Sequence, residues 1–203
     1  GEKNMRKNWA ALALTGMLCL TTFAGTQTVS AETADSAKQV DIVFTHDTHS
    51  HLNTFTTIVD EAEKEVGGFA RINTLIQEQK AKNPDTLVID GGDFSMGTLI
   101  QTVFETQAAE IRMLGYMGCD VTTLGNHEFD YRSKGLANML NSAAESGDNL
   151  PALVVCNVDW ESMEAAGLSE GQQLIRDAFD EYGVSDYVVL EKGDTDIAVV
   201  GVF

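Results

Sequence analysis

The sequence predicts an α/β fold built on a parallel sheet. From residue 40 onward, signals for strands and helices alternate along the chain, and this alternation is typical of parallel strands joined by helical crossovers. Three short polar strings also directly follow three of the strand-like runs. Open parallel sheets bind their ligands outside the carboxyl ends of the strands, so a single site is expected there.

Strands are predicted where β-branched and apolar residues run together. Those of the parallel sheet are expected at residues 40–45, 86–89, 121–124 and 153–156. Two final strands, around residues 187–190 and 197–202, flank the turn-like Gly193-Asp194 and predict a hairpin. Residues 53–67 form a long polar connection, which we interpret as a lid or a substrate loop.

Helices are predicted from apolar residues that recur three or four positions apart. Their apolar positions lie within residues 69–76, 103–114, 136–143 and 174–179. Asn83-Pro84 is expected to stop the first helix, because the residue before a proline disfavours helical geometry. Gly115 and Gly183 are expected to close the second and the last.

The N-terminus is predicted to be an export signal over residues 1–31, with a short upstream extension. Arg6 and Lys7 form a basic segment, residues 9–20 are apolar, and Val29-Ser30-Ala31 is a small-residue cleavage site. The apolar stretch is shorter than the ~20 residues that span a bilayer. We therefore expect an exported protein (secreted, periplasmic or on the cell surface) with no stable membrane span after cleavage. The alternative is an uncleaved membrane anchor.

The chain is strongly acidic, with a formal net charge of −18 at pH 7. Such a chain is repelled by nucleic-acid backbones, so polynucleotide binding is excluded as its main role. Residues 32–39 are polar and predict a flexible mature N-terminus. Cys119 and Cys156 lie in or beside apolar runs and are expected to be buried thiols; a disulfide is permitted but not implied.

The three polar strings offer groups that bind divalent metal ions. They are Asp47-Thr48-His49, Gly91-Gly92-Asp93 and Gly125-Asn126-His127-Glu128-Phe129-Asp130. Their carboxylate, imidazole and carboxamide groups suit hard or borderline ions, which admits manganese, zinc, iron or cobalt. Two such ions ~3.5–4 Å apart can clamp the attacking and leaving oxygens of a phosphoryl group.

The ligand roles follow from residue type and spacing. Asp93 is predicted to bridge two ions, because the two glycines before it let the backbone turn sharply. Asp47 and His49 are two residues apart in what we expect to be an extended loop, so they point to the same side and could hold one ion. Asn126 offers a neutral amide oxygen to the other ion.

His127 and Asp130 are predicted to be a catalytic pair beside the metal ions. His127 directly follows Asn126, so the two side chains cannot easily face the same ion. We expect His127 to face the substrate, where it would stabilise phosphoryl charge or protonate the leaving oxygen. Asp130 would hold that imidazole in the correct tautomer and favour its charged form.

These strings resemble the metallophosphoesterase domain of the bacterial 5′-nucleotidase family, which includes UDP-sugar hydrolases and 2′,3′-cyclic phosphodiesterases. The resemblance is carried by residues 47–52 (DTHSHL), 67–70 (GGFA), 91–93 (GGD) and 125–130 (GNHEFD). It implies a four-layer α/β/β/α domain with two divalent metal ions and a small-molecule nucleotide substrate. It also implies that Asp47, His49 and Asp93 bind one ion, that Asp93 and Asn126 bind the other, and that His127 and Asp130 act on the transition state.

The chain also departs from the pattern of that family. His46 stands where the family commonly has asparagine, and no histidine follows His127, although the family's remaining ligands are histidines of two later loops. The family's nucleoside-binding C-terminal domain has no counterpart here. We therefore expect residues 40–203 to be an incomplete catalytic domain, truncated in its C-terminal half and inactive alone.

The leading interpretation is an exported 5′-nucleotidase that uses a metal-activated water. A 2′,3′-cyclic phosphodiesterase or a UDP-sugar hydrolase remains an alternative, because the metal ligands bind the phosphate and not the base. A second alternative, from a different class, is a truncated, non-catalytic module that binds metal weakly.

Overall fold

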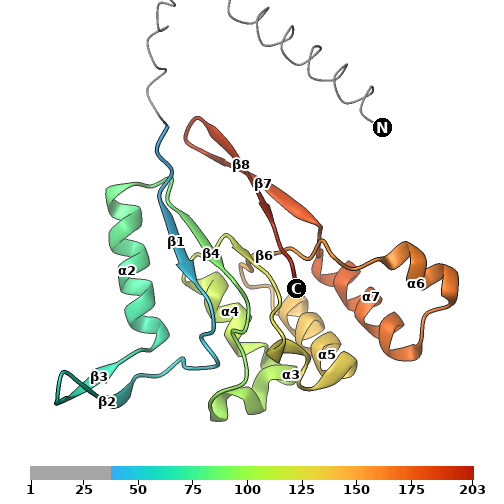
Figure 1. Ribbon diagram of the computed structural model, residues 1–203, viewed down its shortest axis with the longest axis horizontal. Helices are drawn as coiled ribbons and strands as arrows, with labels where there is room; N and C mark the ends of the chain where they lie inside the picture. The colour runs from blue at the N-terminus through green and yellow to red at the C-terminus, as the bar shows by residue number, and fades with distance from the viewer. Residues whose placement is uncertain (1–37) are drawn as a thin grey trace, which may run out of the picture. The chain divides into compact units, whose positions relative to one another are not determined.

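The centre of the molecule is a four-stranded parallel sheet (Figure 1). The structure is a computed structural model and describes residues 38–203. The strand order is β1-β4-β5-β6, formed by Ile42–Thr45, Leu87–Asp90, Val121–Thr122 and Ala152–Leu153. The predicted α/β fold with a parallel sheet is therefore confirmed, although β5 and β6 are shorter than expected. The predicted export signal and most of the predicted flexible N-terminus lie outside the described residues.

Helices follow the strands in the predicted order. The longer ones are α2 (Phe69–Lys82), α5 (Arg132–Glu145) and α7 (Glu170–Tyr182). The first ends at Asn83, as predicted. The last begins with a reciprocal pair of hydrogen bonds between Ser169 and Gln172, and it ends at Gly183, whose φ of 84° is readily adopted by glycine. A further short helix, α6 (Trp160–Ala166), was not predicted.

The second predicted helix is broken. Residues 99–116 form a 3-10 turn, η1 (Leu99–Val103), followed by α3 (Phe104–Gln107) and α4 (Ala109–Tyr116). The break is at Ala108, which is fully buried and left-handed with a φ of 46°. The prediction of one continuous helix was wrong because the apolar spacing continues across the break. The turn lets Phe104 on one side and Ile111 on the other both reach the core.

The polar connection at residues 53–67 is a β-hairpin rather than an irregular loop. Strands β2 (Phe55–Val59) and β3 (Ala62–Val66) pair antiparallel around a turn at Asp60 and Glu61. These two residues have φ values of 53° and 63°. In such turns, positions with a positive φ are usually occupied by asparagine or glycine. Because neither asparagine nor glycine stands at this turn, the sequence contained no signal for a hairpin. The hairpin predicted near the C-terminus is confirmed, as β7 (Tyr187–Lys192) and β8 (Thr195–Val200).

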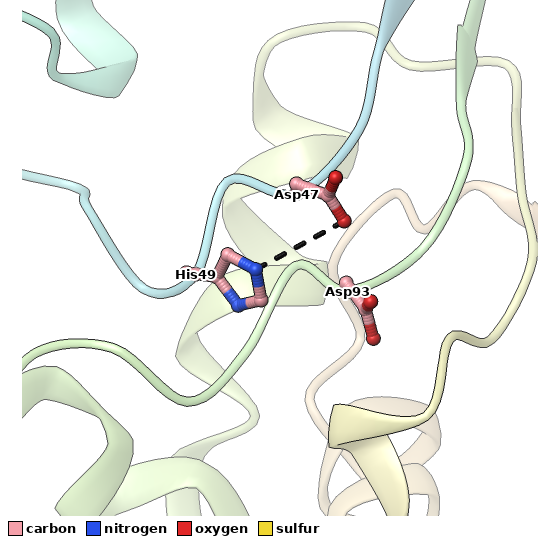
Figure 2. A group of neighbouring side chains, drawn as sticks. All are labelled: Asp47, His49 and Asp93. Carbon is pink, nitrogen blue, oxygen red and sulfur yellow. Dashed lines mark ion pairs between the residues drawn. The ribbon is translucent and has the colours of Figure 1, made fainter.

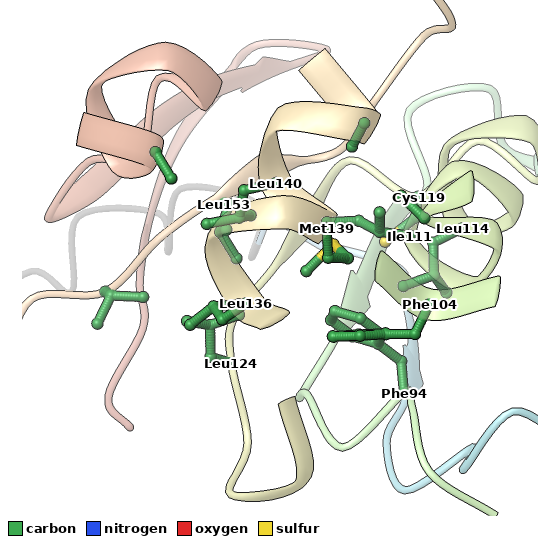
Figure 3. Close-up of a cluster of buried hydrophobic side chains, with 14 of the residues drawn as sticks. Phe94, Phe104, Ile111, Leu114, Cys119, Leu124, Leu136, Met139, Leu140 and Leu153 are labelled. Atoms are coloured by element: carbon green, nitrogen blue, oxygen red, sulfur yellow. The ribbon is translucent and has the colours of Figure 1, made fainter. Parts of the chain in front are cut away.

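The core lies between one face of the sheet and the helices that cover it. Buried side chains from α2, α3, α4, α5 and α7 meet those of β4 and β6. Among the largest are Phe94 of the loop after β4, Phe104 of α3 and Met139 of α5 (Figure 3). On β1, Val43 packs against this cluster, whereas Ile42 and Phe44 are 54% and 59% exposed. Neighbours along a strand point to opposite faces, so the other face of the sheet is open at β1.

The two cysteines of the described residues differ in their exposure. Cys119 is buried, as predicted, but Cys156, which follows β6, is exposed, so that part of the prediction was wrong; neither forms a disulfide. Among residues 38–203, no helix has the length and apolar character to cross a membrane.

Candidate metal centre

Three loops meet at the carboxyl ends of neighbouring strands. The backbone N–H of Asp47, after β1, donates to the carbonyl of Gly92, after β4, at 3.1 Å. His49 N–H donates to the carbonyl of Asp93, also at 3.1 Å. From the loop after β5, the N–H of His127 donates to Oδ1 of Asp93 at 2.9 Å. The three predicted strings therefore form one site, as expected from the rule for parallel sheets.

Three of the predicted ligands form a compact group. Asp47, His49 and Asp93 each offer one ligand atom, and these atoms all lie within 4.8 Å of one another (Figure 2). Nε2 of His49 is 3.9 Å from Oδ1 of Asp47. Two carboxylates and one imidazole at this spacing are a donor set that a divalent ion of the first transition row accepts.

The tautomer of His49 also suits metal binding. Its Nδ1 lies 3.1 Å from the backbone carbonyl oxygen of Ser95, which can only accept a hydrogen bond. Nδ1 therefore carries the proton, and in the neutral ring Nε2 presents its lone pair toward Asp47. A backbone carbonyl that fixes the second nitrogen of a ligating histidine is a common feature of metal sites.

The backbone at all three residues is left-handed. The φ values are 52° at Asp47, 43° at His49 and 51° at Asp93. Residues other than glycine rarely adopt this region, and such strain is concentrated at functional sites, where surrounding contacts hold it. The prediction that residues 47–49 form an extended loop was therefore wrong, although the two side chains do converge.

Two glycines allow the loops to approach closely. Gly92 has a φ of 87°, and a Cβ there would lie 2.6 Å from the backbone nitrogen of Gly125. A Cβ on Gly125 would lie 2.2 Å from Oδ1 of Asp93. Both distances are shorter than any tolerable contact, so both positions require glycine. This agrees with the predicted role of the glycines before Asp93.

The buried carboxylate of Glu128 joins the loop after β4 to the loop after β5. Its side chain is fully buried, and Oε2 accepts hydrogen bonds from the N–H groups of Asp93 (3.0 Å) and Gly125 (2.7 Å). Oε1 accepts from the N–H and the hydroxyl of Ser95, at 3.0 and 2.7 Å. No local pattern in the sequence indicates these four bonds, because Glu128 is 33 to 35 residues from two of its partners.

His127 and Asp130 form the predicted pair. Nδ1 of His127 is 3.0 Å from Oδ2 of Asp130, and both side chains are partly exposed. The pKa of His127 is raised, first by this hydrogen bond and further by the charges of Asp130, Asp93 and Glu128. The imidazole rings of His127 and His49 meet edge to face with centroids 4.9 Å apart. A protonated imidazole is thus favoured directly beside the three-ligand group.

Comparison with known proteins identifies the family of this site. The profile of the calcineurin-like phosphoesterase family matches residues 40–198. This chain belongs to that family. The match contains all the strings that carry the predicted site, from Asp47 to Asp130.

Relatives of this phosphoesterase chain include several 5′-nucleotidases. The 5′-nucleotidase of Mus musculus is 36% identical over 110 residues, which are 53% of this chain and 19% of that protein. A 5′-nucleotidase-related protein of Glossina morsitans morsitans is 29% identical over 187 residues, 88% of this chain and 32% of that protein. The chain thus spans a third or less of the length of these relatives.

A solved structure agrees with the fold. The 5′-nucleotidase precursor of Thermus thermophilus superposes with a TM-score of 0.62 at 26% sequence identity. The superposition covers 80% of this chain and 28% of that one. The parallel sheet and its helices are therefore those of a known phosphoesterase structure over part of its length.

The remaining histidines and Asn126 lie around the three-ligand group of this phosphoesterase. Asn126 is exposed and directly precedes His127 in the loop after β5, and its role as a ligand stays a prediction. His46 is exposed, and its Nδ1 is 2.9 Å from Oδ2 of Asp47, so it contacts a predicted ligand from the outside. His51 turns away, with Nδ1 3.2 Å from the carbonyl of Thr48 and its ring near that of Phe55.

Proposed function

We propose that this chain is part of an exported, metal-dependent hydrolase of nucleotide phosphoesters of the 5′-nucleotidase type. The observation that carries the proposal is the group formed by Asp47, His49 and Asp93 at the carboxyl ends of the sheet, in a member of the calcineurin-like phosphoesterase family. The named 5′-nucleotidases among its relatives support the substrate class. The export signal predicted at residues 1–31 supports the location.

The proposed centre takes two divalent ions. Asp47, His49 and Asp93 would hold one, and Asp93 and Asn126 would contribute to the other. When bound, such ions lower the pKa of a coordinated water and polarise a phosphate oxygen. The chain itself holds these side chains in place. Its loops have a left-handed backbone at the ligands and are joined to one another by backbone hydrogen bonds.

His127 would act on the substrate rather than on the metal. Its raised pKa favours the imidazolium form, which can stabilise negative charge on the phosphoryl group or give a proton to the leaving oxygen. Asp130 accepts a hydrogen bond from Nδ1, which leaves Nε2 and its proton free for the substrate.

The proposed fold of the whole catalytic domain is a four-layer α/β/β/α sandwich. Support comes from apolar side chains that the described residues leave exposed on β1 and on the last hairpin: Ile42, Phe44, Tyr187, Val189 and Val200. A second sheet packed on them would remove this apolar surface from water. It would also bring the histidine ligands that this chain lacks.

The direct test is hydrolysis by the full-length protein in manganese, zinc, iron or cobalt. AMP, UDP-glucose and 2′,3′-cyclic AMP would be compared as substrates, with Asp93→Ala as the inactive variant. Asp177→Ala, an exposed aspartate on α7, is the matched control. AMP as the preferred substrate supports the proposal, and preference for another of the three supports the corresponding alternative. Full activity in Asp93→Ala would refute the site.

A non-catalytic metal-binding module is the second candidate, and the size of the ligand group favours it. Among the described histidine, cysteine, aspartate and glutamate side chains, only three come together. Three ligands suffice to bind one ion loosely. Calorimetric titration with Mn²⁺ separates the two candidates, because tight binding of two ions by the chain counts against the module.

A further inference from the structure

Asp90 is a buried carboxylate that the proposed chemistry does not use. It is the last residue of β4, and only 1% of its surface is exposed. Its Oδ2 accepts a hydrogen bond from the hydroxyl of Thr45 at 2.7 Å. Its Oδ1 accepts from the hydroxyl of Thr122 and from the N–H of Gly92, each at 3.0 Å. Both oxygens therefore accept hydrogen bonds inside the protein.

The partners of Asp90 lie at the bases of all three loops of the site. Thr45 ends β1, two residues before Asp47. Thr122 ends β5, directly before the segment that leads to residues 125–130. Gly92 directly precedes Asp93. One carboxylate thus joins the carboxyl ends of three neighbouring strands where the predicted ligands begin.

The peptide groups of Gly92 connect Asp90 to the ligands themselves. The N–H of Gly92 donates to Asp90, and its carbonyl accepts from the N–H of Asp47 at 3.1 Å. Gly92 is therefore bound on both sides, once to the buried carboxylate and once to the loop that carries Asp47. A shift of this residue would move Asp47 and Asp93 relative to each other.

We propose that Asp90 is a positioning residue for the metal centre: its hydrogen bonds to Thr45, Thr122 and Gly92 set the approach of the Asp47 and Asp93 carboxylates. This inference rests on the proposed function, since it assigns Asp90 a role in the site described there. Asp90 itself touches neither substrate nor metal.

The raised pKa of Asp90 agrees with a role other than stabilising the fold. Burial is the main cause that raises its pKa, to about 6, and the nearby charge of Glu128 adds to this. The three hydrogen bonds act in the opposite direction. An ionised carboxylate in the interior at neutral pH opposes folding, so stability alone does not account for Asp90, whereas its hydrogen bonds to the three loops do.

Two variants and one control separate positioning from general stability. Asp90→Ala removes all three hydrogen bonds. Asp90→Asn is the conservative variant, because its amide oxygen can accept from Gly92 and Thr122 while its amide NH₂ donates to the oxygen of Thr45. The control is Asp120→Ala, because Oδ2 of Asp120 accepts from the N–H of Val88 at 2.8 Å and so also joins the start of β5 to β4. Asp120 lies at the end of β5 opposite to the ligand loops, and its Oδ1 also accepts from Nζ of Lys192 at 3.0 Å.

The first measurement needs neither metal nor activity. Amide hydrogen exchange at Asp47 is followed by NMR in the metal-free full chain, because that N–H donates to Gly92. We expect Asp90→Ala to accelerate this exchange at least about tenfold relative to the control, which corresponds to the loss of one to two hydrogen bonds. Asp90→Asn is expected to stay close to the wild type.

The second measurement is the affinity for Mn²⁺ by calorimetry. Loss of groups that orient metal ligands typically weakens binding about 10–100-fold, and we expect that loss in Asp90→Ala but not in Asp120→Ala. Equal effects of the two alanine variants, or none from Asp90→Ala, would overturn the inference. If the wild type binds no Mn²⁺, the proposed function fails, and the exchange data still decide on Asp90.

A milder pair of variants covers the case in which Asp90→Ala does not fold. Thr45→Val and Thr122→Val each remove one hydrogen bond to Asp90 and keep a β-branched side chain in its strand. Each is expected to accelerate exchange at Asp47 several-fold. Unchanged exchange in both would overturn the inference as well.

Discussion

Replacing Glu128 with glutamine tests how firmly two of the ligand loops are held together. The two carboxylate oxygens of Glu128 accept four hydrogen bonds, from the N–H groups of Asp93 and Gly125 and from the N–H and hydroxyl of Ser95. The Glu128 side chain is fully buried, so water cannot replace any of these four hydrogen bonds. A glutamine has the same size but only one accepting oxygen.

The magnitude follows from the two orientations of the amide. If the NH₂ group replaces Oε2, the N–H groups of both Asp93 and Gly125 lose their acceptor. If it replaces Oε1, only the N–H of Ser95 loses one, because the Ser95 hydroxyl can rotate and accept. The second orientation is favoured. One buried unsatisfied N–H costs ~1–3 kcal/mol, and the loss of charge assistance in the remaining bonds adds ~1 kcal/mol. We expect Glu128→Gln to lower the free energy of unfolding by about 2–4 kcal/mol.

Urea unfolding at pH 7 measures this loss, and Glu110→Gln is the matched control. Glu110 on α4 is equally buried, but Oε1 accepts one hydrogen bond, from the hydroxyl of Ser50 at 2.6 Å, and Oε2 has no partner among residues 38–203. Burial also raises the pKa of Glu110. Its substitution buries an amide NH₂ but also removes a charge that burial disfavours, so the expected net cost is less than ~1 kcal/mol. Equal losses in the two variants, or no loss in Glu128→Gln, would refute the reasoning.

Three further predictions concern other parts of the chain. Because the pKa of Asp90 is raised from 3.8 to about 6, its ionisation destabilises the folded state by about 3 kcal/mol. This destabilisation is absent below pH ~4 and is complete above pH ~6. The stability of Asp90→Asn should therefore rise relative to the wild type between pH 4 and 7 in urea unfolding, and a constant difference contradicts this. Asp130→Asn should lower the pKa of His127 in an NMR titration, and an unchanged value argues against the pair. Met139→Ala, at a fully buried position, should reduce the free energy of unfolding by ~2–5 kcal/mol, and a loss under ~1 kcal/mol contradicts the packing described.

The positions of the parallel strands and the meeting of the three loops could be predicted because the strands are marked by local signals. Apolar runs identify strands, and the carboxyl ends of parallel strands share one edge of the sheet. Polar residues that directly follow those runs, such as Asp47 and Asp93, must then lie near each other. Their grouping with His49 agrees with that expectation.

The loop conformations could not be predicted, because distant contacts impose them. Asp47 and Asp93 adopt a left-handed backbone against their local preference, and each is held by hydrogen bonds to residues more than 30 positions away. Ala108 also has a left-handed backbone, at a fully buried position, and it breaks a helix that the apolar spacing continues. Asp90 carried no signal of its own, since its partners come together only in the folded sheet.

The central claim is that Asp47, His49 and Asp93 bind a divalent metal ion. Calorimetric titration of the full chain with Mn²⁺ tests it most directly, with Asp93→Ala and the control Asp177→Ala measured alongside. The account predicts binding in the wild type and the control, and an affinity at least about tenfold weaker in Asp93→Ala. No binding by the wild type, or the same affinity in all three proteins, would contradict it.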